Sequence, residues 1–159
     1  MFDDILAANR DYAAGFALAG LDPRAAKGLG VVTCIDSRIE PLAMLGLRPG
    51  DAKILRNAGG RVSDDVLRSL ALATHLLGVE RICIVQHTRC RMVGATNEEI
   101  RAAIGPAADG RDFLPIDDQH RTLADDVRAV RESPLIPGGV SVAGFIYDVD
   151  TGLLEPVVP

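Results

Sequence analysis

Two short apolar runs with an amphipathic segment between them constrain the fold of this chain more than any other feature. Residues 28–35 and 81–86 are rich in Val, Ile and Leu, which is typical of buried strands. Between them, Ser63 is a good helix N-cap, and residues 64–77 carry a broad apolar surface at helical spacing until Gly78. A strand, a helix and a second strand in this order predict a parallel sheet flanked by helices.

The rest of the chain extends this α/β pattern. Residues 52–56 predict another strand, and residues 140–149 predict a last long strand. A turn at residues 150–152 and the short run 153–158 follow, which predicts an antiparallel hairpin at one edge of the sheet. Further helices are expected at residues 2–18, with part of that helix facing the core, and at residues 41–47, 97–104 and 122–131. No repeat or linker is visible, so a single domain over residues 1–159 is expected.

Composition narrows the class of protein. Of the 159 residues, 48% are apolar and 25% are charged, as in an ordered globular chain, and the net charge is −5. Because Lys and Arg are scattered, neither nucleic acid nor an anionic membrane is expected as a partner. The acidic start and the short, glycine-broken residues 13–21 predict neither a secretory signal nor a membrane span, so we expect a cytoplasmic protein. Three cysteines cannot all pair with one another, which favours metal binding or catalysis over a disulfide framework.

Polar residues gather where two of the predicted strands end. Cys34, Asp36 and Arg38 alternate after the first strand, so an extended backbone would place all three on one face. His87 and Cys90 follow another strand of the same sheet. Open parallel sheets bind their ligands outside the carboxyl ends of the strands. These five residues are therefore the candidate site.

The types of ligand favour zinc. Cys34, His87 and Cys90 offer two thiolates and one imidazole, which zinc accepts in a tetrahedral shell. A structural zinc site normally has a fourth cysteine or histidine, whereas three protein ligands leave one position open. This ligand set therefore predicts a catalytic metal ion.

Other interpretations exist for single residues. Cys83 lies four residues before His87, which is roughly 13 Å along a strand at about 3.3 Å per residue, too far to share the ion. We expect Cys83 to be a small apolar residue of the sheet core. A lone cysteine such as Cys34 is more often a buried thiol than a metal ligand, so its placement together with His87 and Cys90 is the stronger signal. Asp36 and Arg38 are also consistent with a surface ion pair, which contributes about 0 to 1 kcal/mol to stability.

The same residues resemble the signatures of the β-class carbonic anhydrase family. Cys34, Asp36 and Arg38 match the first signature, and His87 and Cys90 match the second. The resemblance covers most of the chain, including residues 46–51, 56–60, the helix beginning near residue 63, and residues 147–152.

This resemblance implies a fold, a cofactor and a reaction. One zinc ion per subunit would be held by Cys34, His87 and Cys90, in an α/β homodimer or higher homo-oligomer whose substrate pocket lies at a subunit interface. The implied activity is reversible hydration of carbon dioxide to bicarbonate and a proton by zinc-bound hydroxide. Asp36 would accept a hydrogen bond from the nucleophile, and Arg38 would keep Asp36 charged and aligned. In a closed form of such sites, Asp36 would instead bind zinc and displace water.

One residue departs from the family pattern. The family often has glycine directly after the second metal cysteine, and this chain has Arg91. Such a side chain would crowd the pocket, redirect the backbone or point to solvent. Two alternative functions therefore stand beside the first: hydrolysis of carbon disulfide on the same fold, and noncatalytic bicarbonate binding in a regulatory protein.

Overall fold

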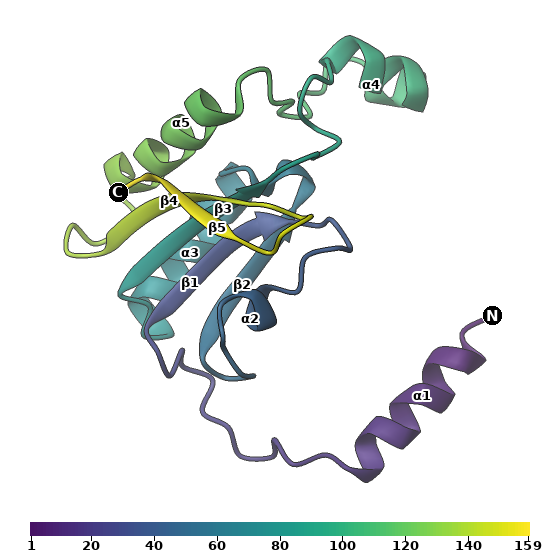
Figure 1. The fold of residues 1–159 in the computed structure, drawn as a ribbon, viewed down its shortest axis with the longest axis vertical. Coiled ribbons are helices and arrows are strands. Elements are labelled where there is room, and N and C mark those ends of the chain that lie inside the picture. Colours follow the sequence, from purple (N-terminus) through teal and green to yellow (C-terminus); the bar gives the residue numbers. More distant parts are fainter.

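The computed structural model describes residues 1–159 and is built on a five-stranded sheet in the order β2-β1-β3-β4-β5 (Figure 1). The strands are β1 (Leu29–Cys34), β2 (Ala52–Asn57), β3 (Arg81–His87), β4 (Ser141–Tyr147) and β5 (Leu154–Val158). All neighbouring pairs are parallel except β4 and β5, which are antiparallel at the edge. The prediction of a mainly parallel sheet with an antiparallel edge strand is confirmed.

Helices connect the strands at the expected places. They are α1 (Asp3–Ala14), α2 (Pro41–Met44), α3 (Asp64–Leu76), α4 (Asn97–Ile104) and α5 (Gln119–Glu132), with 3-10 turns η1 (Ala58–Gly60) and η2 (Pro106–Ala108). Ser63 caps α3 as predicted, since its side chain accepts a hydrogen bond from the Val66 amide at 3.4 Å. Helix α5 begins three residues earlier than expected because the Asp118 carboxylate caps it.

The main core lies between the sheet and the helices α3 and α5. Leu70 of α3 and Leu123 of α5 are fully buried against Val32 and Ile84 of the two central strands. Gly144 of β4 allows α5 to approach, because a Cβ atom there would lie only 3.0 Å from side-chain atoms of α5. This packing fixes the central strands and therefore the positions of the residues that follow them.

The opposite face of the sheet is less completely covered. Val31 and Val85 are buried there beneath residues of α2 and the loop after it. Cys83, Phe145 and Tyr147 on the same face are only half-buried. Parallel sheets are normally covered on both faces, so this side lacks part of its cover in the single chain.

Helix α1 projects away from the rest of the chain (Figure 1). None of its residues is buried, and the apolar side chains of Ile5, Leu6 and Tyr12 are each more than half exposed. The expectation that part of this helix faces the core is therefore wrong for the single chain, since no other element packs against it. No helix in the structure combines the length and apolar character needed to cross a membrane.

Candidate metal centre

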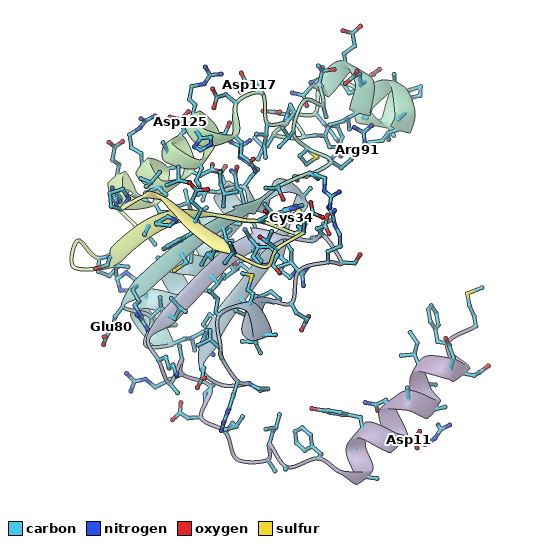
Figure 2. All side chains as sticks on the ribbon, viewed as in Figure 1. Asp11, Cys34, Glu80, Arg91, Asp117 and Asp125 are labelled. Atoms are coloured by element: carbon cyan, nitrogen blue, oxygen red, sulfur yellow. The ribbon has the colours of Figure 1, made fainter.

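Two adjacent strands bring the candidate ligands together. β1 ends at Cys34 and β3 ends at His87, and the two strands are parallel neighbours whose carboxyl ends meet at one edge of the sheet. The chain then turns, which places Cys90 beside them. Figure 2 shows Cys34 at the opposite end of the sheet from Glu80, the residue just before β3.

The ligand atoms of these three residues are close enough to hold one ion. The Cys34 and Cys90 sulfurs and an imidazole nitrogen of His87 all lie within 4.8 Å of one another, and the two sulfurs are 4.0 Å apart. The side chains of Cys34, His87 and Cys90 are buried. None of the cysteines in the chain forms a disulfide. Cys83 is not part of this group, as its position four residues before His87 predicts.

His87 is arranged to present one nitrogen to that group. Its Nδ1 atom lies 2.9 Å from the Thr88 carbonyl, which accepts a hydrogen bond when Nδ1 carries the proton. Its Nε2 atom is buried and has no hydrogen-bond partner. A buried polar atom without a partner is costly, and a metal ion bound to Nε2 would satisfy it.

The two thiols influence each other strongly. The hydrogen bond with Cys90 lowers the pKa of Cys34 to about 4, against the opposing effect of burial. The same contact, together with burial, raises the pKa of the Cys90 thiol. The low pKa of Cys34 favours its thiolate form, the form in which cysteine binds a metal ion. Two thiolates and one imidazole fit zinc, which prefers these ligands.

Asp36 and Arg38 form a tight pair at the rim. The Asp36 Oδ1 atom accepts hydrogen bonds from the Arg38 amide at 3.0 Å and Nε at 2.9 Å, and Oδ2 accepts one from Nη2 at 2.7 Å. These bonds hold the pKa of the Asp36 carboxyl well below its usual range. Oδ2 lies 3.8 Å from His87 Nε2. Arg38 therefore bonds both oxygens of the Asp36 carboxylate.

The geometry of this pair differs from the extended strand that the alternating residues predict. β1 ends at Cys34, and the chain then bends so that the Asp36 carboxylate accepts a hydrogen bond from the Arg38 backbone amide. Arg56 of β2 stabilises the bend, since its guanidinium donates to the Cys34 carbonyl at 3.0 Å and the Asp36 carbonyl at 2.7 Å. The pairing of Asp36 with Arg38 therefore depends on a turn.

A glycine makes close packing possible behind the ligands. Gly60 has a φ of +64°, and a Cβ atom there would lie 3.1 Å from the Cys34 amide nitrogen and from the Val85 carbonyl oxygen. Glycine at residue 60 is therefore required by a close backbone approach to β1 and β3, whereas Gly59, with a φ of +79°, lies against the side chains of Arg61 and Ile116.

Arg91 points away from the ligands. The side chain is exposed, and Figure 2 shows it on the loop that leads to α4. It lines a cavity of about 190 Å³ whose other residues are Met92, Ala95, Glu99, Ile100, Ala103 and Ile104. Of the three possibilities for this residue, the structure thus favours a solvent-exposed side chain over one that crowds the metal site.

Several contacts around the site were not apparent from the sequence. The Thr88 carbonyl orients His87, and the Gln119 side chain donates a hydrogen bond to the His87 carbonyl at 2.9 Å. Gln119 lies just before the helix predicted over residues 122–131, so no pattern pointed to it. Thr88 was detectable only as the residue next to a candidate ligand.

The fold and this centre define a class: an α/β protein with a Cys-His-Cys group, suited to one metal ion, at the carboxyl ends of adjacent parallel strands. Comparisons with known proteins identify the family. Residues 29–109 match the family described as "Carbonic anhydrase". The chain is 36% identical over 160 residues to Beta-carbonic anhydrase 1 of Mycobacterium tuberculosis, with 99% of this chain and 98% of that protein covered.

The structural comparison agrees. A crystal structure of carbonic anhydrase from Streptococcus mutans superposes with a TM-score of 0.89 at 40% identity, covering 98% of this chain and 96% of that one. The chain is also 34% identical over 151 residues to a carbon disulfide hydrolase of Acidithiobacillus thiooxidans, covering 80% of this chain and 76% of that protein. This chain belongs to the β-carbonic anhydrase family.

Proposed function

We propose that this protein catalyses the reversible hydration of carbon dioxide to bicarbonate and a proton, with Cys34, His87 and Cys90 holding one zinc ion per subunit. The observation that carries this proposal is the buried, unpartnered His87 Nε2 atom, which shares a small space with two sulfurs and lies beside the Asp36–Arg38 pair. Zinc, when bound, supplies a Lewis acid that lowers the pKa of water to about 7.

Asp36 has the role of orienting the nucleophile. Because Arg38 holds its pKa well below the usual range, Asp36 is a carboxylate at neutral pH and accepts a hydrogen bond without taking the proton. Its position, 3.8 Å from His87 Nε2, is close enough to the ligand group for this contact. Arg38 keeps the carboxylate aligned through two side-chain bonds.

A second reaction deserves a direct comparison, because relatives 34% identical to this chain are carbon disulfide hydrolases. The test is to measure hydration of carbon dioxide and hydrolysis of carbon disulfide on the same zinc-quantified preparation. We expect carbon dioxide to be turned over with the larger kcat/KM. Faster turnover of carbon disulfide would replace the proposal by the second reaction. Zinc-loaded protein that binds bicarbonate and turns over neither substrate would instead support a regulatory binding protein.

The active unit is a homodimer or a higher assembly of such dimers. Three features support this proposal: the half-covered face of the sheet, the unpacked helix α1, and Ile35, an apolar residue between Cys34 and Asp36 that is 61% exposed. A second copy that covers Ile35 would supply the missing wall of a substrate pocket. Large apolar surfaces of this kind mark interfaces between subunits.

The proposed compartment is the cytoplasm. The chain has three free thiols, two of which are the proposed metal ligands, and thiols remain reduced in that compartment. Cell fractionation with antibody detection tests this directly, because recovery in an oxidising compartment would contradict it.

A further inference from the structure

The turn between β4 and β5 packs directly against the loop that carries the metal ligands. Residues 148–153 form this turn, and Thr88 and Arg89 lie between the candidate ligands His87 and Cys90. The Thr88 amide donates to the Tyr147 carbonyl at 2.9 Å, and the Arg89 side chain forms an ion pair with Asp150. Two segments that are distant in sequence are therefore joined beside the site.

All the polar groups of Thr88 have hydrogen-bond partners, and its amide and hydroxyl make the connection to the turn. Its hydroxyl donates to the Asp148 Oδ1 atom at 3.3 Å and accepts a bond from the Val149 amide at 3.1 Å. Its carbonyl is the acceptor for His87 Nδ1 at 2.9 Å. The orientation of the imidazole ring therefore depends on where the turn holds Thr88.

Asp148 is itself fixed within the turn. Its Oδ1 atom also accepts a hydrogen bond from the Asp150 amide at 2.8 Å. Its backbone bonds to Leu153 and Gly152 at 2.8 Å each. The Asp148 carboxylate, which accepts the hydrogen bond from the Thr88 hydroxyl, is thus held in place by bonds within the turn.

The neighbouring residue links the same turn to the rim of the site. Arg89 has a φ of +54°, a left-handed conformation that non-glycine residues rarely adopt. This conformation presents its carbonyl to Arg38 Nη2 at 3.2 Å, while the other bonds of Arg38 hold Asp36. The ion pair with Asp150 holds the side chain of Arg89, whose backbone has this rare conformation.

We infer that Thr88 and Asp148 are positioning residues for the metal centre, acting through the Thr88 carbonyl on His87. This inference rests on the proposed zinc site. It assigns to the β4–β5 turn the task of holding one ligand in the orientation that binds the ion. Groups that orient a metal-bound histidine typically contribute about 10- to 100-fold to metal affinity.

The test measures metal binding rather than activity. Thr88→Val removes the hydroxyl and keeps the shape of the side chain, whereas Thr88→Ser keeps the hydroxyl. Thr74→Val is the matched control, because the Thr74 hydroxyl bonds only to carbonyls of its own helix at 2.9 and 3.1 Å. Each protein is titrated with zinc against a chelator, and the absorption spectrum of the cobalt(II)-loaded form reports the geometry of the ligands.

We expect Thr88→Val to bind zinc about 10- to 100-fold more weakly and to shift the cobalt bands. Thr88→Ser should restore both values, and Thr74→Val should match the wild type. Wild-type affinity and spectrum in Thr88→Val would overturn the inference, as would an equal loss in Thr74→Val.

If Thr88→Val does not fold, a second variant tests whether the turn positions His87. Asp148→Asn keeps the size of the side chain and weakens the bonds to the Thr88 hydroxyl and the Asp150 amide, so zinc affinity should fall severalfold. An unchanged affinity would overturn the inference. Failure of the wild-type protein to bind zinc or cobalt would instead overturn the proposed function, on which this inference rests.

Discussion

Asp36 shows how a single side chain acquires a role from its neighbours. An exposed Asp–Arg pair on an ordinary surface contributes little, but this one lies beside a buried histidine nitrogen that has no partner. Arg38 keeps the carboxylate ionised, so the charge needed to orient a nucleophile is present at neutral pH.

The first prediction concerns this charge. Asp36→Asn keeps the shape of the side chain and removes its negative charge, so zinc content should stay at the wild-type value while kcat falls roughly 100-fold. Stopped-flow hydration assays and metal analysis of the same sample measure both quantities. Asp117→Asn is the control, because Asp117 is an exposed carboxylate that bonds to the Arg121 side chain and the Asp118 amide and to none of the candidate ligands. A fully metallated Asp36→Asn protein with the wild-type rate would refute the role of Asp36.

The second prediction distinguishes a cysteine that binds zinc from one that does not. Cys34→Ser should lose most of its zinc, because a hydroxyl is a much poorer zinc ligand than a thiolate. Cys83→Ser should retain it, since Cys83 packs on the half-covered face of the sheet and is not part of the ligand group. Metal analysis after dialysis distinguishes them, and equal zinc content in the two variants would show that Cys34 is not a ligand.

At the residue scale, the sequence predicted which side chains gather but not how they are held. Cys34, His87 and Cys90 follow strands, and strand ends of a parallel sheet meet predictably. The Asp36–Arg38 bond depends on a turn after β1, and the orientation of His87 depends on the Thr88 carbonyl. A backbone carbonyl is present in every residue, so its role leaves no pattern in the sequence.

Gly60 is required by the packing of a whole element, the turn η1. The backbone of this turn lies so close to β1 and β3 that no side chain fits at Gly60. Gly46 has a similar φ of +63°, but nothing lies within 4 Å of a Cβ atom built there. Both glycines thus have a left-handed backbone conformation, but only Gly60 also lies in close contact with neighbouring backbone.

The third prediction uses this pair. Both Gly60→Ala and Gly46→Ala place alanine in a left-handed conformation, which costs about 1–2 kcal/mol. Only Gly60→Ala also pushes on the backbone of Cys34, so it should be the less stable variant and should bind zinc more weakly. Urea denaturation and chelator competition measure the two effects. Equal stability and equal zinc affinity in the two variants would mean that the close approach is unimportant.

At the element scale, the strands and α3 were predictable because their apolar patterns and caps are local. The exposure of α1 was not predictable, since a helix that packs on its own core and one that packs elsewhere have the same amphipathic pattern. The start of α5 was missed because its cap, Asp118, lies in a stretch rich in Gly, Pro and Asp.

The whole molecule presents apolar surface that one chain does not cover. Helix α1 and the half-covered sheet face are the two main parts of this surface, and both are explained by the proposed dimer. The extent of the domain, residues 1–159, stays a prediction from the sequence.

The fourth prediction tests the dimer through α1. The double variant Ile5→Asp and Leu6→Asp places charges on the apolar face of the helix, so it should shift the protein to a smaller species in light scattering coupled to size-exclusion chromatography. Leu76→Asp is the control, because it adds a charge to an exposed apolar residue of α3, which covers the other face of the sheet from the one assigned to the dimer. A double variant with the mass of the wild type would show that α1 does not hold the assembly together.

The central claim is that hydration of carbon dioxide depends on a metal ion held by Cys34, His87 and Cys90. The most direct measurement is the stopped-flow hydration rate of the wild-type protein as zinc is restored stepwise to the metal-free form, with zinc content determined for each sample. We expect the rate to rise in proportion to bound zinc and to level off at one ion per subunit. A rate that does not change as zinc is restored, or full zinc loading without turnover, would contradict it.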